Sequence, residues 1–311
     1  MFVTVVTDNA FFDWLMDILR ALARLRTPVL DALMSAVTYL GDEVFVLFVA
    51  LILFWCVDKK YGYRFLWIEL IGNFCNLGLK VLFHIPRPWD IDPSFAIVEA
   101  ARSGATGFSF PSGHTQGVAM LFTLLARRIR KGWAYAAAAF LVALVAFSRM
   151  YLGVHTLLDV GVGLILGVAV VLLGEWVLSK CGDGDRVYTL LAGIAAFLCV
   201  GAAAAGLLTV RENVSQCKDL CVLAGLSLAL LFGSVIERRY VRFETETVWW
   251  AQILKVAVGV ALILGIKAGL KPLLALVSSS PVMDGVRYGL VGFIAIAVYP
   301  LTFRFLPKKK H

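Results

Sequence analysis

Three short segments of this chain carry residue types that bind oxyanions and transfer protons. They read KVLFHIPRP at 80–88, PSGH at 111–114 and SRMYLGVHTLLD at 148–159. Between them they contain cationic, imidazole and carboxylate side chains, namely Lys80, Arg87, Arg149, His114, His155 and Asp159. Most other charges stand beside long apolar runs, where they serve as membrane anchors or topology signals. The three segments therefore hold the candidate chemistry of the chain.

His155 and Asp159 have the spacing of a nucleophile and the group that orients it. They are four residues apart at the expected start of a helix, so their side chains lie on one face. A carboxylate bonded to one ring nitrogen of an imidazole fixes the tautomer and leaves the other nitrogen free to attack. We therefore predict that His155 is a nucleophile and that Asp159 orients it.

The remaining motif residues suit an anion with several equatorial oxygens. Three cations are more than an apolar helix end requires, and arginine binds such oxygens with paired donors. The backbone amides of Ser112 and Gly113 lie at an expected helix N-terminus, which attracts anions, and Gly113 allows a close approach of the chain. His114, beside them, is placed to protonate a departing alkoxide. The pattern predicts phosphoryl transfer through a phosphohistidine, with the charge balanced by side chains and without a metal.

The elements that must position these residues are membrane helices. Hydrophobic residues make up 60% of the 311-residue chain, charged residues only 16%, and the mean hydropathy is +0.85. Soluble globular domains carry about 25% charged residues, and disorder requires low hydrophobicity with high charge, so both classes are excluded. The net charge of +8 is divided among short clusters between apolar runs, which fits membrane topology and not nucleic-acid binding.

The apolar segments predict an all-α polytopic bundle with about nine spans. They are expected near 42–58, 62–84, 114–127, 132–150, 155–178, 187–209, 219–236, 248–270 and 286–304. The third is shorter than the roughly 20 apolar residues that a span normally needs, so polar groups must lie at membrane depth, where they are usually functional. Before the spans, residues 9–26 alternate Phe and Leu with Asp and Arg at helical spacing, which predicts an amphipathic helix in the membrane interface.

The basic residues predict the orientation of the bundle. Loops on the side of the C-terminus hold more Lys and Arg than loops on the other side, with a dense cluster at 127–131. Because positively charged loops stay in the cytoplasm, we expect a cytoplasmic C-terminus. The three motifs then lie on the extracytoplasmic face.

Taken together, the three motifs resemble the type 2 phosphatidic acid phosphatase family, the membrane branch of a superfamily that includes vanadium haloperoxidases. KVLFHIPRP fits K-x6-RP, PSGH is intact, and SRMYLGVHTLLD fits SR-x5-H-x3-D, in the order of the family. The resemblance implies a six-helix, mainly transmembrane catalytic core and no metal cofactor. It implies that His155 is the nucleophile, Asp159 its orienting group and His114 the general acid, which then activates the water. The implied phosphate-binding residues are Lys80, Arg87, Ser112, Gly113 and Arg149.

The expected organisation is an interfacial helix at 1–30, a catalytic core at 31–180 and additional spans at 181–311. We expect a phosphatase acting on a lipid phosphate or diphosphate of the phosphatidic acid, phosphatidylglycerophosphate or undecaprenyl diphosphate type, in a bacterial plasma membrane. Three alternatives share the motifs: a sugar-phosphate phosphatase resembling glucose-6-phosphatases, a lipid phosphotransferase, and a non-catalytic lipid-binding or scramblase-like relative. Retention of every motif position argues against the last.

Overall fold

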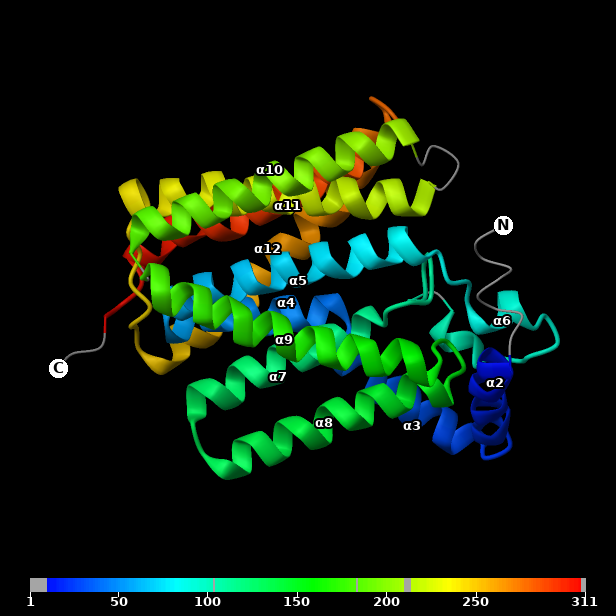
Figure 1. The fold of residues 1–311 in the computed structure, drawn as a ribbon. Helices are drawn as coiled ribbons and strands as arrows, with labels where there is room; N and C mark the ends of the chain where they lie inside the picture. The colour runs from blue at the N-terminus through cyan, green and yellow to red at the C-terminus, as the bar shows by residue number, and fades with distance from the viewer. Residues whose placement is uncertain (1–9, 103, 183, 210–213, 309–311) are drawn as a thin grey trace. The chain divides into compact units, whose positions relative to one another are not determined.

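The computed structural model describes residues 10–102, 104–182, 184–209 and 214–308, and every regular element in these ranges is a helix (Figure 1). Seven of the described helices are long and apolar enough to cross a membrane, and a bent pair, Pro28–Gly41 with Glu43–Val57, raises the number to eight. The prediction of an all-α membrane protein is confirmed. The remaining expected span corresponds to α7 (Gly113–Ile129), whose 17 residues are few for a full crossing, so the number nine stays a prediction.

The chain forms two compact units. Unit 1 comprises residues 1–46 and 72–175, and unit 2 comprises residues 47–71 and 176–311. Residues 47–71 thus group with the C-terminal helices, although the sequence assigns them to the catalytic core. The expected boundaries at 30 and 180 remain predictions.

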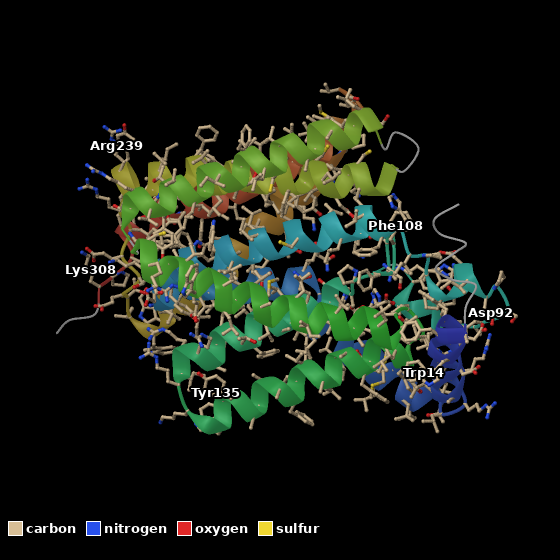
Figure 2. All side chains as sticks on the ribbon, in the orientation of Figure 1. Trp14, Asp92, Phe108, Tyr135, Arg239 and Lys308 are labelled. Atoms are coloured by element: carbon tan, nitrogen blue, oxygen red, sulfur yellow. The ribbon has the colours of Figure 1, made fainter. Side chains whose placement is uncertain are left out.

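Unit 1 contains all three motifs. Its described elements are α2 (Ala10–Ala23), α3 (Pro28–Thr38), η1 (Tyr39–Gly41), the start of α4 (Glu43–Ile52), the end of α5 (Lys59–Phe83), α6 (Pro88–Ile91), η3 (Glu99–Ala101), α7, α8 (Gly132–Tyr151) and most of α9 (Leu157–Cys181). Trp14, Asp92 and Phe108 lie toward one end of this unit and Tyr135 toward the other (Figure 2). The motif loops are at the first of these ends.

Local sequence explains how α5 and α7 stop and start at the motifs. α5 ends where His84 adopts a left-handed conformation (φ 51°) and its N–H donates to the carbonyl of Lys80 at 3.1 Å. The following IPRP stretch cannot continue a helix, because proline lacks the N–H and disfavours helical backbone before it. α7 begins after Ser112, whose hydroxyl caps the helix by accepting from the amide of Thr115 at 3.4 Å.

Glycines bring α9 against α7 at the level of the motifs. A Cβ at Gly163 would lie 2.7 Å from the carbonyl oxygen of Ser112, and one at Gly167 would lie 2.7 Å from that of Gln116. No real side chain tolerates such distances, so the two backbones touch directly. This contact fixes the second and third turns of α9 beside the first turn of α7.

The N-terminal helix α2 has the apolar face that its spacing predicts. Phe12 and Leu15 pack with Ile85 and Phe110, both of which lie in or beside the motif loops. Met16 and Leu19 form a second cluster with Phe95, and they bury the rest of this face. The protein's own loops therefore cover the helix, and its place in a membrane interface stays a prediction.

The described elements of unit 2 are the end of α4, η2 (Leu53–Val57), the start of α5, the end of α9, α10 (Asp185–Thr209), α11 (Val214–Ile236), η4 (Glu237–Val241), α12 (Trp249–Ala275), α13 (Pro281–Phe293), η5 (Ile294–Val298) and η6 (Tyr299–Phe305). Its closest helix contact joins α11 to α13 through small residues. A Cβ at Gly285 would lie 2.5 Å from the carbonyl oxygen of Cys221, and Gly225 faces the backbone of Gly285 even more closely. Small residues in membrane helices permit this approach.

Candidate active site

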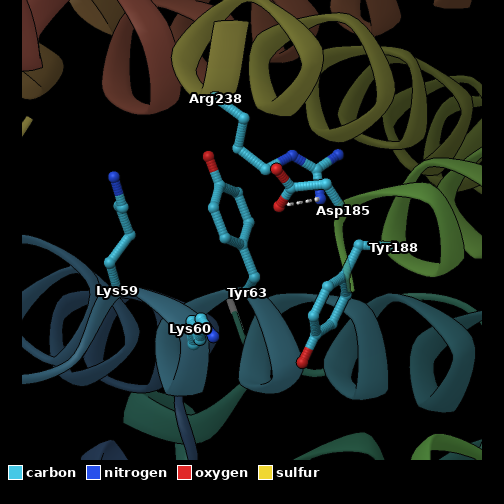
Figure 3. Close-up of a pocket in the computed structure, with 6 residues that line it drawn as sticks. All are labelled: Lys59, Lys60, Tyr63, Asp185, Tyr188 and Arg238. Atoms are coloured by element: carbon cyan, nitrogen blue, oxygen red, sulfur yellow. Dashed lines mark ion pairs between the residues drawn. The ribbon is translucent and has the colours of Figure 1, made fainter. Parts of the chain in front are cut away.

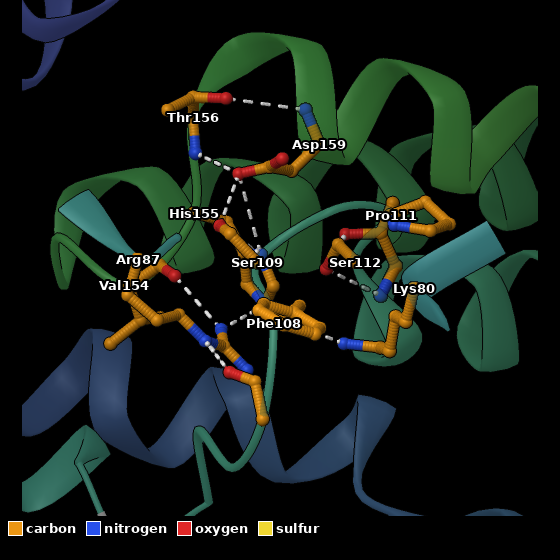
Figure 4. A network of polar contacts seen from close by, with 12 residues as sticks. Lys80, Arg87, Phe108, Ser109, Pro111, Ser112, Val154, His155, Thr156 and Asp159 are labelled. Carbon is orange, nitrogen blue, oxygen red and sulfur yellow. Dashed lines mark hydrogen bonds and ion pairs between the residues drawn. The ribbon is translucent and has the colours of Figure 1, made fainter. Parts of the chain in front are cut away.

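The predicted site residues come from five places in unit 1. Lys80 is in the last turn of α5, Arg87 precedes α6, Ser112 to His114 begin α7, Arg149 is in the last turn of α8, and His155 to Asp159 lead into α9. Several of them meet in one polar network with the loop between α6 and α7 (Figure 4).

Asp159 is fully enclosed and anchors the orienting side of the network. Its Oδ2 accepts from the backbone amide of Thr156 at 2.7 Å and from the hydroxyl of Ser109 at 2.6 Å. The Nδ1 of His155 lies 3.6 Å from the same oxygen and 3.5 Å from the hydroxyl oxygen of Ser109. The predicted pairing of His155 with Asp159 is present, but the separation exceeds that of a direct hydrogen bond. Ser109 lies against both groups.

Sequence reasoning missed Ser109. The only available signal was its position two residues before PSGH, in the loop that leads into α7. A serine in a loop has many ordinary roles, and nothing in its spacing relates it to a carboxylate fifty residues later. Only the close packing of α9 on α7 brings the two together.

Arg87 determines which nitrogen of His155 can act. Its Nη1 lies 3.0 Å from Nε2 of His155 and also donates to the carbonyl of Val154 at 3.0 Å. A guanidinium carries donors only, so Nε2 must be the acceptor and carries the lone pair, and the ring proton belongs on Nδ1 beside Asp159. Burial, together with the positive charges of Arg87 and Arg149, holds the pKa of His155 well below its ordinary value. The geometry therefore yields a neutral imidazole with Nε2 as the nucleophilic atom.

Arg87 also braces the loop beside it. Its Nε donates to the carbonyl of Gly107 at 3.0 Å, and its Nη2 donates to that of Thr106 at 2.6 Å. Lys80 acts on the same loop, because its Nζ donates to the carbonyl of Phe108 at 2.7 Å. Both cations therefore hold the backbone that precedes PSGH as well as facing the site.

Arg149 is in a different situation. Its side chain is buried, and Nη1 donates to the hydroxyl of Thr38 at 2.8 Å. Its Nε and Nη2 are also enclosed, yet among the described residues they have no acceptor. A buried donor without an acceptor costs free energy. These two nitrogens of the Arg149 guanidinium are therefore well suited to bind an oxygen of an anionic ligand.

The PSGH residues only partly fit the expectation that the backbone amides of Ser112 and Gly113 bind phosphate. The amide of Ser112 donates to the carbonyl of Asp159 at 3.0 Å, so it is already engaged and not directed at an anion. Its hydroxyl oxygen accepts from the amide and the hydroxyl of Thr115, and neither contact uses the hydroxyl's own proton. Gly113 is exposed at the first position of α7, and the half-buried His114 interacts electrostatically with Arg149 and His155. Phosphate binding by Ser112 and Gly113 remains a prediction, through the hydroxyl in the case of Ser112.

No three His, Cys, Asp or Glu side chains within the described ranges are grouped so that they could hold a metal ion. Independence from metals and cofactors remains a prediction.

Two family profiles match most of this chain. The PAP2 superfamily profile matches residues 61–183, which include all three motifs, and a profile described as the PAP2 superfamily phosphatase transmembrane extension matches residues 221–311. This chain belongs to the PAP2 superfamily. The predicted family is confirmed, and the C-terminal helices, expected only as additional spans, match the transmembrane extension of this superfamily.

Two named relatives and one solved structure are similar to parts of this chain. Phosphatidylglycerophosphatase B of Bacillus subtilis (strain 168) is 29% identical over 160 residues, which cover 48% of this chain and 75% of that protein. Lipid phosphate phosphatase delta of Arabidopsis thaliana is 30% identical over 164 residues, which cover 48% of this chain but only 38% of that protein. A crystal structure of a transmembrane PAP2-type phosphatidylglycerolphosphate phosphatase from Bacillus subtilis aligns with a TM-score of 0.47 and 27% identity, covering 58% of this chain and 92% of that one. The predicted enzyme class, a membrane phosphoric monoester hydrolase, is confirmed.

Proposed function

We propose that this PAP2 superfamily member hydrolyses a lipid phosphate or diphosphate through a phosphohistidine formed on His155. The observation that carries the proposal is the acceptor state of Nε2 in the buried, neutral imidazole of His155. The positive charge of Arg149 acts on the same ring, and two nitrogens of Arg149 have no acceptor among the described residues. A lone pair next to unoccupied cationic donors is the arrangement that attack on phosphorus requires.

The first half-reaction forms one bond and breaks another. Nε2 of His155 attacks phosphorus as the bond from phosphorus to the lipid oxygen breaks, and the imidazole becomes positively charged. Asp159 stabilises that charge from the Nδ1 side, with Ser109 holding the carboxylate in place. His114 gives its proton to the departing alkoxide.

The second half-reaction regenerates the enzyme. His114, now neutral, takes a proton from water, and the resulting hydroxide attacks phosphorus. The bond between phosphorus and Nε2 breaks, and inorganic phosphate leaves. In both steps the guanidinium of Arg149 stabilises the negative charge that develops on the equatorial oxygens. The other proposed phosphate contacts are Lys80, Arg87, Ser112 and Gly113.

The proposed substrate is a lipid because the motif residues adjoin apolar spans and because relatives bear the names of lipid phosphatases. Phosphatidic acid, phosphatidylglycerophosphate and undecaprenyl diphosphate are the candidate types. From the distribution of Lys and Arg we further propose an extracytoplasmic site, a cytoplasmic C-terminus and a bacterial plasma membrane.

The test is a phosphate-release assay on purified protein in detergent, with a panel of lipid phosphates, glucose 6-phosphate and an alcohol acceptor. We expect release from at least one lipid phosphate, an acid-labile phosphoryl label on the protein, and loss of both in His155→Ala. Turnover of the sugar phosphate alone would reject the lipid assignment, and transfer mainly to the acceptor would identify a phosphotransferase. Unchanged release by a folded His155→Ala protein would reject the mechanism.

A further inference from the structure

Unit 2 contains a second cluster of charged side chains, outside the catalytic motifs. A cavity of about 220 Å³ is lined by three cations, one carboxylate and two tyrosines (Figure 3). The lining residues are Lys59, Lys60, Tyr63, Asp185, Tyr188 and Arg238. α5 and α10 begin here, and the span containing α11 and η4 ends here, so the cavity lies at the membrane-surface ends of three spans. Lys80 is in the last turn of α5, whereas this cavity is at its first turn.

One buried carboxylate next to the cavity is already neutralised. Glu237 is fully enclosed, and its two oxygens accept from Nζ of Lys59 at 2.9 Å and from the hydroxyl of Tyr63 at 2.7 Å. Lys59 also donates to the carbonyl of Phe243 at 3.0 Å. Glu237 therefore cannot serve as the counterion of the other cations around the cavity.

Arg238 is the cation held most firmly toward the cavity. Its side chain is only 9% exposed, and its guanidinium lies over the rings of Tyr63 and Tyr188, at 5.3 Å and 6.0 Å from their centroids. Nη2 donates to the hydroxyl of Thr189 at 2.9 Å, and both Nε and Nη2 bond to Ser234. Nη1 is buried and has no hydrogen-bond acceptor among the described residues. The neighbouring residues thus orient the guanidinium of Arg238, while its Nη1 remains available to a ligand.

Asp185 is a weak occupant of that position. Its carboxylate lies 3.9 Å from Nη1 of Arg238, beyond hydrogen-bond distance, and its side chain is 76% exposed. Exposed pairs of this kind contribute little. An incoming oxyanion that reaches Nη1 directly would displace the carboxylate, with the exposed Lys60 available as a second contact.

We propose that this cavity binds the phosphate group of an anionic ligand at the membrane surface where α5 begins. Paired arginine donors and lysine ammonium groups recognise phosphate oxygens, and basic pockets between membrane helices take anionic headgroups. Two sources present this group at a membrane surface: the headgroup of an anionic phospholipid and inorganic phosphate from solution. The site is separate from the catalytic motifs, so its occupancy does not depend on the proposed reaction.

The test measures ligand retention by native mass spectrometry and by thermal unfolding in detergent. The probes are phosphatidylglycerol, phosphatidylcholine as a neutral-headgroup comparison, and inorganic phosphate. We expect the wild-type protein to retain phosphatidylglycerol in preference to phosphatidylcholine, and Arg238→Gln to bind it about tenfold more weakly, as the loss of one charge-assisted hydrogen bond implies. Asp185→Asn should bind more tightly, because the competing carboxylate is gone. Stabilisation by inorganic phosphate at similar strength, if it is weaker in Arg238→Gln than in the wild-type protein, would identify the soluble anion as the source.

The matched control is Arg239→Gln. It removes the same charge from the adjacent position, but Arg239 is exposed and does not line the cavity (Figure 2). Lys60→Gln is a second test variant, because Lys60 lines the cavity but is exposed. Its effect on lipid retention can be measured even if Arg238→Gln fails to fold. Equal retention of every probe by the wild-type protein, Arg238→Gln and Lys60→Gln would overturn the proposal, and so would an equal loss in Arg239→Gln.

Discussion

Replacing Arg87 or Arg149 by methionine is expected to change the stability of the protein in opposite directions. Sequence patterns give both the same role, phosphate binding, but their surroundings differ. Arg87 donates to the carbonyls of Thr106, Gly107 and Val154. Arg149 donates only to Thr38, and two of its nitrogens have no acceptor among the described residues.

These contacts set the sign and size of the stability changes. The two unpartnered nitrogens of Arg149 carry three N–H groups, and each buried unsatisfied donor costs about 1–3 kcal/mol. The lost bond to Thr38 is worth about 1.5–3 kcal/mol. Taking the low end of both ranges, Arg149→Met should gain about 1.5 kcal/mol, or roughly 3–6 °C in melting temperature. Arg87→Met leaves three carbonyls without their charged donor and should lose about 4 kcal/mol.

Activity should fall in both variants, by about 10²–10³ in kcat for Arg149→Met, as for other lost donors at a developing charge. The assay pairs phosphate release with thermal unfolding monitored by tryptophan fluorescence in the same detergent. Inorganic phosphate should raise the melting temperature of Arg149→Met less than that of the wild-type protein, because one of its proposed binding groups is gone. Melting temperatures that shift in the same direction for Arg87→Met and Arg149→Met would refute the distinction drawn from the hydrogen bonds.

Three further results are expected. Ser109→Ala should lower kcat about 10- to 100-fold with little change in KM, because it removes a charge-assisted hydrogen bond from the carboxylate that orients the nucleophile; steady-state kinetics check this, and an effect on KM alone would contradict it. Phosphate release in excess EDTA should equal release without it, and recovery that requires added Mg²⁺ would reject the metal-free reaction. Gly225→Leu should unfold unit 2 at a lower temperature than the wild-type protein, because its side chain would force α11 away from α13; an unchanged melting curve would show that this contact is dispensable.

The sequence predicts the helical class and the meeting of the motifs well, because both depend on strong local signals. Apolar runs of membrane length exclude other folds, and the motif spacings identify residues that the structure brings into one unit. The closeness of His155 and Asp159 is local and follows from their separation of four residues, although α9 begins only at Leu157, so His155 precedes the helix instead of sharing its face.

What could not be predicted depends on contacts between distant segments. The engagement of the Ser112 amide by Asp159 and the position of Ser109 both follow from the approach of α9 to α7 at Gly163 and Gly167. A glycine in an apolar helix is equally compatible with lipid contact, so its spacing does not identify the helix that it faces.

The main-chain contact between α7 and α9 has an evolutionary consequence. The proposed acid, His114, is in the first turn of α7, and the proposed nucleophile, His155, precedes α9. The contact between the two backbones therefore sets the distance between these two imidazoles. Exchanges of side chains around the rim leave that distance unaltered. Substitutions in the surrounding loops are therefore expected to change headgroup preference while they leave the spacing of the reacting atoms unchanged.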